Sequence, residues 1–159
     1  MASDLTPALV ELPATPYPLH LRLATTALIL IDMQRDFLEP GGFGAILGND
    51  VSLLRSAVAP CQRLLAAARS AGLLVIHTRE GHGPDLADAH PAKLARGKGP
   101  LRIGDHGPMG RILIQGEHGH DIIPELAPAP GEPVLDKPGK GAFYNTDLAL
   151  ILANHGIHT

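Results

Sequence analysis

Cysteine and aromatic residues are scarce in this chain of 159 residues. There is one cysteine and no tryptophan, and aromatic side chains make up 3% of the residues. A single cysteine cannot form an internal disulfide, so nothing requires an oxidising compartment. Basic residues are not in surplus either, with 13 Lys and Arg against 16 Asp and Glu. A nucleic-acid-binding protein usually has a surplus of basic residues, and one that binds single strands has aromatic side chains that stack on the bases. The composition therefore argues against this class of protein.

Long apolar segments are lacking as well. The longest uninterrupted run, ALILI at 27–31, is too short to span a bilayer. No basic segment leads into an apolar run near the N-terminus, as it would in a signal peptide. Hydrophobic residues nevertheless make up 45% of the chain and charged residues 18%, which is a globular composition. We therefore expect a soluble, cytoplasmic α/β protein that binds neither membrane nor nucleic acid.

Three apolar runs predict strands of one parallel sheet. The segments 27–32 and 73–78 each open with an uninterrupted run of mostly branched apolar side chains, over 27–31 and 73–76, which is typical of strands buried on both faces. A shorter run covers 133–137. Helical patterns lie between the runs, so the sequence alternates strand, helix and strand, which is typical of βαβ units with right-handed crossovers. We expect the three strands to be adjacent or near neighbours, with residues 27–32 the most deeply buried.

Two longer segments carry a helical pattern. Residues 50–71 predict a helix that begins at a capping Asn49 or Asp50 and is kinked or split by Pro60. Residues 145–155 predict a second helix, which a glycine ends.

The remaining segments have little periodicity. Residues 1–24 contain four prolines and predict an irregular arm that could lie on a partner subunit. Residues 80–119 are rich in Gly, Pro and His, and so long a connection is usually functional. A short helix is expected over 120–126. Residues 157–159 follow a helix stop, so we expect them to begin a fourth strand that needs a pairing partner.

Two charged residues stand at the ends of the outer apolar runs. Asp32 ends the first run and Lys137 the third, and the carboxyl ends of parallel strands are where α/β sheets place their ligand crevice. If the strands are parallel, the two side chains project towards the same end and could form an ion pair. A loop-capping acid and a lysine on a Gly/Pro turn are the open alternatives. Asp36 and Glu39 are interpreted as solvated acids.

Histidine and cysteine offer weaker candidates. Neither an HExxH motif nor a Cys/His framework is present, so a metal site is less expected than loop positions for the histidines at 77, 82, 90, 106, 118 and 120. Cys61 lies within the first predicted helix, without the helix N-terminus or cation that a nucleophilic thiol needs. We interpret it as a packing residue.

Three segments together resemble the isochorismatase-like cysteine hydrolases. They are ALILIDMQRDF at 27–37, LLVIHTREGHGPDLAD at 73–88 and VLDKPGKGAFYNTDL at 134–148. A further segment, GRILIQGEHGHDIIPEL at 110–126, looks most like biuret and triuret hydrolases, with ureidoacrylate amidohydrolases as the neighbouring group. The resemblance implies a three-layer α/β/α fold with a parallel, Rossmann-like sheet, of which residues 25–159 are the N-terminal portion.

The resemblance also implies a mechanism. Asp32 would be the general base that takes a thiol proton, and Lys137 would hold the thiolate and the Asp in place. Cysteine attack on an amide carbonyl would give a thioester that water then cleaves. Phe37 would cover the substrate and Lys140 would bind one of its carbonyls. No metal or cofactor is implied, since REGH at 79–82 replaces the D-W-H motif of the metal-binding nicotinamidases.

The nucleophile of such enzymes lies in a V-T-x-x-C-V element that would fall beyond Thr159. We therefore expect an oligomeric hydrolase of a small linear ureide such as biuret or triuret, whose fold a second polypeptide or chain segment completes. The 159 residues alone are expected to be inactive. Two alternatives stay open. One is a non-catalytic binding or scaffold relative, and the other is an isochorismatase proper, which cleaves a vinyl ether without a cysteine.

Overall fold

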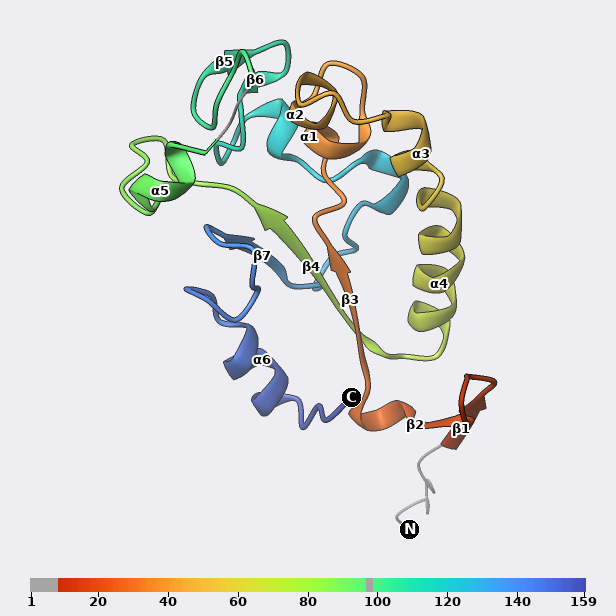
Figure 1. The fold of residues 1–159 in the computed structure, drawn as a ribbon. Helices are drawn as coiled ribbons and strands as arrows, with labels where there is room; N and C mark the ends of the chain where they lie inside the picture. Colours follow the sequence, from red (N-terminus) through yellow and green to blue (C-terminus); the bar gives the residue numbers. More distant parts are fainter. Residues whose placement is uncertain (1–8, 97–98) are drawn as a thin grey trace.

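The computed structural model describes residues 9–96 and 99–159. At its centre lies a sheet of three parallel strands, in the order β3 (Ala27–Ile31), β4 (Leu74–Glu80) and β7 (Val134–Lys137) (Figure 1). The three predicted strands and their common direction are confirmed. The carboxyl ends of all three therefore lie at one edge of the sheet, which is where the charged candidates are placed.

β4, rather than β3, is the most buried strand. It has a hydrogen-bonded neighbour on each side, and four consecutive residues from Val75 to Thr78 are buried. β3 pairs with β4 on one side only, and Ile31 at its end is 58% exposed. The prediction that residues 27–32 are the most buried is wrong. Apolar content indicates that a strand is buried but does not reveal which strand has two neighbours.

Two helices replace the single helix expected over 50–71. α3 (Val51–Arg55) begins at Asp50, whose carboxylate accepts backbone N–H groups of the first turn. α4 (Val58–Ser70) follows after a short break. Pro60 lies in the first turn of α4, where its missing N–H is not needed, and the break comes just where its ring would meet the preceding turn. The predicted split is present, upstream of the proline.

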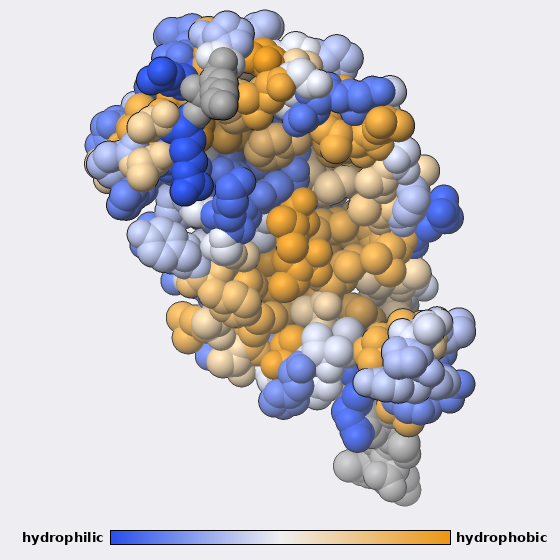
Figure 2. All heavy atoms as spheres, in the orientation of Figure 1, coloured by the Kyte–Doolittle hydropathy of each residue, from blue (hydrophilic) through white to orange (hydrophobic). Residues whose placement is uncertain are grey.

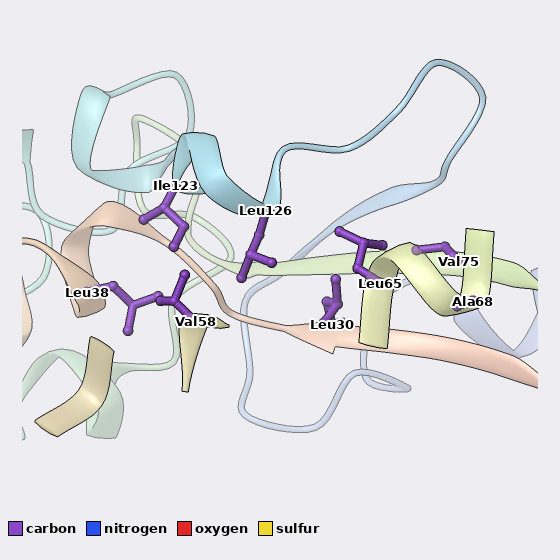
Figure 3. Packing of buried hydrophobic residues seen from close by; sticks show 8 residues of the cluster. All are labelled: Leu30, Leu38, Val58, Leu65, Ala68, Val75, Ile123 and Leu126. Atoms are coloured by element: carbon purple, nitrogen blue, oxygen red, sulfur yellow. The ribbon is translucent and has the colours of Figure 1, made fainter. Parts of the chain in front are cut away.

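α4 packs on one face of the sheet and forms the main hydrophobic core with it (Figure 3). Leu65 and Ala68 of α4 belong to the same buried cluster as Leu30 of β3 and Val75 of β4. The cluster is completed by Leu38, Val58, Ile123 and Leu126. This burial of apolar area supplies the main stabilisation of the sheet on that face.

α6 (Leu148–Asn154) lies on the other side of the sheet from α4 (Figure 1). Ile29 of β3 lines a hollow shared with Leu152 of α6, whereas Leu28 lines a hollow shared with α4. Successive side chains of a strand point to opposite faces, so the arrangement is the expected three-layer α/β/α fold.

The N-terminal arm is partly regular. β1 (Leu9–Leu12) and β2 (Leu19–Arg22) form an antiparallel hairpin that leads through the 3₁₀ turn η1 (Leu23–Thr25) into β3. The expectation of an irregular arm is wrong over this hairpin. Three of the prolines of the arm lie in the connection at 13–18, where they interrupt no ladder hydrogen bond.

Residues 157–159 return to the beginning of β3. The His158 N–H donates to the Thr25 carbonyl at 2.8 Å, and the Ala27 N–H donates to the Thr159 carbonyl at 2.9 Å. The residues thus lie beside the edge strand β3, but the fourth strand expected to begin here is not formed.

Short elements make up the rest of the described chain. Two helical turns follow β3, namely α1 (Arg35–Leu38) and α2 (Phe43–Ile46). The long connection between β4 and β7 contains α5 (Pro91–Leu94), β5 (His106–Gly107), β6 (Gly110–Arg111), η2 (His118–His120) and η3 (Pro124–Leu126). The helix expected over 120–126 is therefore two separate 3₁₀ turns.

An ion network ties α4 to the sheet below the core. Arg69 of α4 donates two hydrogen bonds to Glu132, at 2.7 and 2.8 Å. Glu132 also lies 2.9 Å from the buried His77 ring and accepts the Ala129 N–H at 2.9 Å. These interactions, the Arg69 hydrogen bonds first, lower the pKa of the Glu132 carboxyl to about 2. The carboxylate is held in its ionised form.

Stability should therefore fall in acid through Glu132. Its pKa is depressed in the folded state, so the stabilisation is fully present above about pH 5 and is lost as the pH falls toward about 2. Glu132→Gln is expected to lower the free energy of unfolding by about 1.5 kcal/mol at pH 7, and to flatten its dependence on pH over this window. Urea denaturation at several pH values measures both effects. Glu11→Gln on the exposed hairpin is the control, and equal slopes for all three proteins would contradict the prediction.

Candidate active site

Asp32 and Lys137 meet at the carboxyl ends of their strands. The Lys137 ammonium lies 2.7 Å from one oxygen of the Asp32 carboxylate, and the Thr78 hydroxyl donates to the other oxygen at 2.8 Å. Lys137 is 1% exposed, so its charge depends on this partner. The structure brings the two predicted residues together in the manner expected from parallel strands.

Local backbone geometry sets both side chains. Asp32 has a φ of 55°, and its N–H donates to the Thr78 carbonyl, so the chain leaves β3 sharply while still tied to β4. Aspartate is among the few residue types that adopt this left-handed conformation readily. The Lys137 ammonium also donates to the carbonyls of Gly139 and Lys140, at 3.2 and 3.3 Å. The loop after β7 thus wraps around its own lysine.

Glu80 is a third charged residue of the site, and the sequence analysis did not single it out. It ends β4 directly opposite Lys137 in the strand register. One of its carboxylate oxygens lies 3.9 Å from the Lys137 ammonium, and the other lies 2.7 Å from that of Lys93. In the sequence it lies two residues beyond the predicted strand 73–78, so it lacks the strand-end position that identifies Asp32.

The fully buried Gln34 fixes the position of Glu80. Its side-chain oxygen accepts the Glu80 N–H at 2.7 Å, and its amide nitrogen donates to the carbonyls of Glu80 and His120, each at 3.0 Å. One amide therefore pairs both backbone groups of Glu80 and ties them to the η2 turn. A side chain with so many buried partners has little freedom to move.

A cavity of about 490 Å³ opens beside Glu80, whose carboxylate lies 3.9 Å from the Lys137 ammonium. Phe37 and Lys140 line it, as expected, and Glu80 forms part of its wall. Asp32 and Lys137 are not lining residues, so of the four residues that the resemblance assigns to the site only Phe37 and Lys140 line this cavity. The remaining wall is made by Phe43, Leu47, His90, Ala92, Lys93, Arg96, Ile103 and Leu113.

Asp36 holds two walls of this cavity together. It is 2% exposed, and its carboxylate accepts the Leu113 N–H at 3.1 Å and the Phe43 N–H at 3.3 Å. Burial raises the pKa of the Asp36 carboxyl, against the lowering effect of these hydrogen bonds. The interpretation of Asp36 and Glu39 as solvated acids is wrong. The long connection folds over Asp36, and Glu39 forms a part-buried pair with Arg35.

Comparison with known proteins identifies the architecture. The isochorismatase domain family matches residues 26–159. The chain belongs to this family. A solved isochorismatase family protein from Desulfovibrio vulgaris superposes with a TM-score of 0.65 at 32% identity, covering 84% of this chain and 63% of that one. A cysteine hydrolase from Pseudomonas syringae pv. phaseolicola gives a TM-score of 0.66 at 27% identity, covering 86% and 57%.

The sequence relatives of this isochorismatase-family chain include ureidoacrylate amidohydrolases. The RutB protein of Pantoea ananatis, which carries that name, is 35% identical over 137 residues, which are 84% of this chain and 55% of the relative. The RutB protein of Serratia proteamaculans is 32% identical over 94% of this chain and 62% of the relative. The chain thus spans somewhat more than half the length of these curated relatives.

The buried histidines of the isochorismatase domain each lie beside one acid. His77 is 2.9 Å from Glu132, and His82 is 3.1 Å from Asp88. His120 is 3.5 Å from Asp136, and burial lowers the pKa of its ring. Among residues 9–96 and 99–159, no group of three or more His, Cys, Asp or Glu side chains could hold a metal ion.

Cys61 lies away from this site. It sits on α4, part-buried, and packs against the hydrophobic core. It is not a lining residue of the cavity. Its position matches that of a small packing residue, as the sequence predicts.

No helix in the described part of the chain has the length and apolar character needed to cross a bilayer.

Proposed function

We propose that the enzyme containing this chain hydrolyses a C–N amide bond of a small linear ureide. The observation that carries the proposal is the 2.7 Å contact between Asp32 and the buried Lys137, at the carboxyl edge of the sheet and next to a cavity. The amidohydrolase names of the sequence relatives support the choice of bond. Biuret, triuret and ureidoacrylate are the substrates to be tested.

The proposed nucleophile is a cysteine from outside these 159 residues. Asp32 takes the proton of its thiol, and the Lys137 ammonium stabilises the thiolate. The sulfur bonds to the amide carbon, and the C–N bond breaks as the leaving nitrogen receives the proton from Asp32. Water then cleaves the thioester and regenerates the thiol. Phe37 covers the bound ureide, and Lys140 donates a hydrogen bond to one of its carbonyls.

The part of the protein that brings this cysteine is proposed to cover the free side of β3. Ile31 at the end of that strand is 58% exposed. Phe143, which precedes α6, is 66% exposed, and Leu150 within α6 is 59% exposed. Figure 2 shows apolar surface over the middle of the molecule, where β3 and α6 lie in Figure 1. Beyond Ala27, no strand in the described part of the chain pairs with this edge of β3, and exposed apolar surface next to such an edge favours a covering segment. An oligomer of identical chains is proposed as well.

Ammonia release from the three ureides tests this proposal. The enzyme containing the chain is expected to hydrolyse at least one of them, and Cys61→Ala is expected to leave the rate unchanged. The 159 residues alone should release no ammonia, and adding back the remaining polypeptide should restore release. Hydrolysis by the 159 residues alone that survives Cys61→Ala would overturn the mechanism. Ureide binding without hydrolysis in the complete protein would favour a non-catalytic relative.

A further inference from the structure

Lys137 has a second carboxylate beside it, which the proposed mechanism leaves unused. Its ammonium group lies 2.7 Å from the Asp32 carboxylate and donates to two carbonyls of its own loop. Glu80 stands opposite Lys137 in the strand register, and one of its carboxylate oxygens is 3.9 Å from the ammonium nitrogen. At this separation the two groups attract through their charges without a hydrogen bond. Glu80 therefore does not compete with Asp32 for the protons of the ammonium group.

Glu80 is itself held from two sides. The buried Gln34 pairs with both its N–H and its carbonyl, and its second carboxylate oxygen lies 2.7 Å from the Lys93 ammonium. Lys93 is fixed in turn, because it donates to the Pro138 carbonyl at 2.7 Å. The Glu80 carboxylate thus has a charged partner that takes no part in the proposed chemistry. Its position and its charge do not depend on the state of Asp32.

The state of Asp32 does change during the proposed reaction. Asp32 receives the proton of the thiol and holds it until the leaving nitrogen takes it up. Throughout this interval Lys137, which is 1% exposed, faces a neutral acid in place of its closest carboxylate. A buried ammonium group without a charged partner is costly. Glu80 is the carboxylate that stays beside it, because its position is fixed by the backbone of β4.

We infer that Glu80 is a positioning residue, which keeps the Lys137 ammonium in place while Asp32 is protonated, and that Lys93 holds Glu80 for this task. This role rests on the proposed function. A charge that is already in position needs no rearrangement as the reaction proceeds, so it favours the transition state more than a charge that must move. Loss of the Glu80 charge should therefore slow the chemical step and leave substrate binding nearly unchanged.

Kinetics of the complete enzyme test the role. Glu80→Gln is expected to lower kcat roughly tenfold and to change KM less than about twofold. Glu80→Asp keeps the charge but shortens the side chain, so it should retain more of kcat than Glu80→Gln, which keeps the shape. A role in packing alone predicts the reverse order. Lys93→Met should lower kcat by a smaller factor. Glu11→Gln, on the exposed hairpin, is the matched control and should change neither constant.

Urea denaturation of the complete protein tests the same contact without any substrate. Asp32→Asn imitates the protonated acid, so Glu80→Gln should lower the urea midpoint about twice as far in this background as in the wild type. In a Lys137→Met background there is no ammonium group to hold, and Glu80→Gln should lower the midpoint less than in the wild type. This second background decides the question if the variant that combines Asp32→Asn with Glu80→Gln does not fold.

The outcomes separate this role from the proposed function. Equal midpoint shifts in the wild-type and Lys137→Met backgrounds overturn the contact between Glu80 and Lys137. A loss that falls on KM alone overturns the positioning role, because Glu80 lines the cavity and would then bind the substrate. If the wild-type enzyme hydrolyses none of the ureides, the proposed function is wrong and the positioning role is wrong with it. The midpoint shifts then still decide whether Glu80 stabilises the buried ammonium group.

Discussion

Replacing Lys137 with methionine is expected to lower the free energy of unfolding by about 3 kcal/mol, because it leaves the Asp32 carboxylate without its charged partner. Methionine has nearly the length of lysine and keeps the apolar contacts of the stem, so the loss reports the ammonium group. In the complete enzyme the same change should reduce kcat/KM roughly a thousandfold, since the group that holds the thiolate and the base is gone.

A double-mutant cycle separates the ion pair from its surroundings. Asp32→Asn retains the hydrogen bond from the Thr78 hydroxyl but leaves the buried Lys137 ammonium without its closest carboxylate. The double variant removes both charges and should be more stable than the two single losses predict, by at least about 1 kcal/mol. Urea denaturation measures the cycle. Lys140→Met, an exposed lysine in the same loop, should change stability by less than about 0.5 kcal/mol. Strict additivity would show that the 2.7 Å contact contributes nothing.

The two residues of this pair could be found from the sequence because their positions follow from strand direction alone. Once residues 27–32 and 133–137 are assigned to one parallel sheet, Asp32 and Lys137 necessarily leave it at the same edge. A lysine that enters the interior at this edge needs an acidic partner, and Asp32 is the acid that the first predicted strand places there. The pairing depended on local patterns and one rule of topology, and both are visible in a sequence.

Features that depend on chain packing could not be found in this way. The central position of β4 is set by which strands pair, and the burial of Asp36 is set by the long connection that folds over it. Glu80 lies two positions beyond the predicted strand 73–78, and its ion-pair partner Lys93 is thirteen positions further along the chain. The β1–β2 hairpin is hidden by prolines that all fall outside its ladder. Each of these features requires contacts between segments that have no recognisable relation in sequence.

Gly81→Ala is expected to destabilise the domain by about 2–3 kcal/mol, because a side chain at this position has no room. A Cβ atom there would lie 2.3 Å from Nε2 and 2.4 Å from Cδ2 of His120, whose ring is completely buried. Gly81 directly follows Glu80, and its N–H donates to the Lys137 carbonyl at 3.1 Å. Relief of the clash must therefore move either the buried ring or the strand end that carries the site.

Removing the ring tells these possibilities apart. In a His120→Ala background the added methyl group enters the space that the imidazole occupied, so Gly81→Ala should then cost less than about 1 kcal/mol. Gly141→Ala is the matched control, since its Cβ would meet nothing within 4 Å. Urea denaturation of the four proteins of the cycle measures the coupling. The prediction fails if Gly81→Ala leaves the free energy of unfolding unchanged, or if it lowers it equally with and without the His120 ring. Either result would show that the backbone at the end of β4 shifts to make room for the methyl group. In the complete enzyme, the rate of the Gly81→Ala variant relative to the wild type would then measure how strongly activity depends on the positions of Glu80 and Lys137.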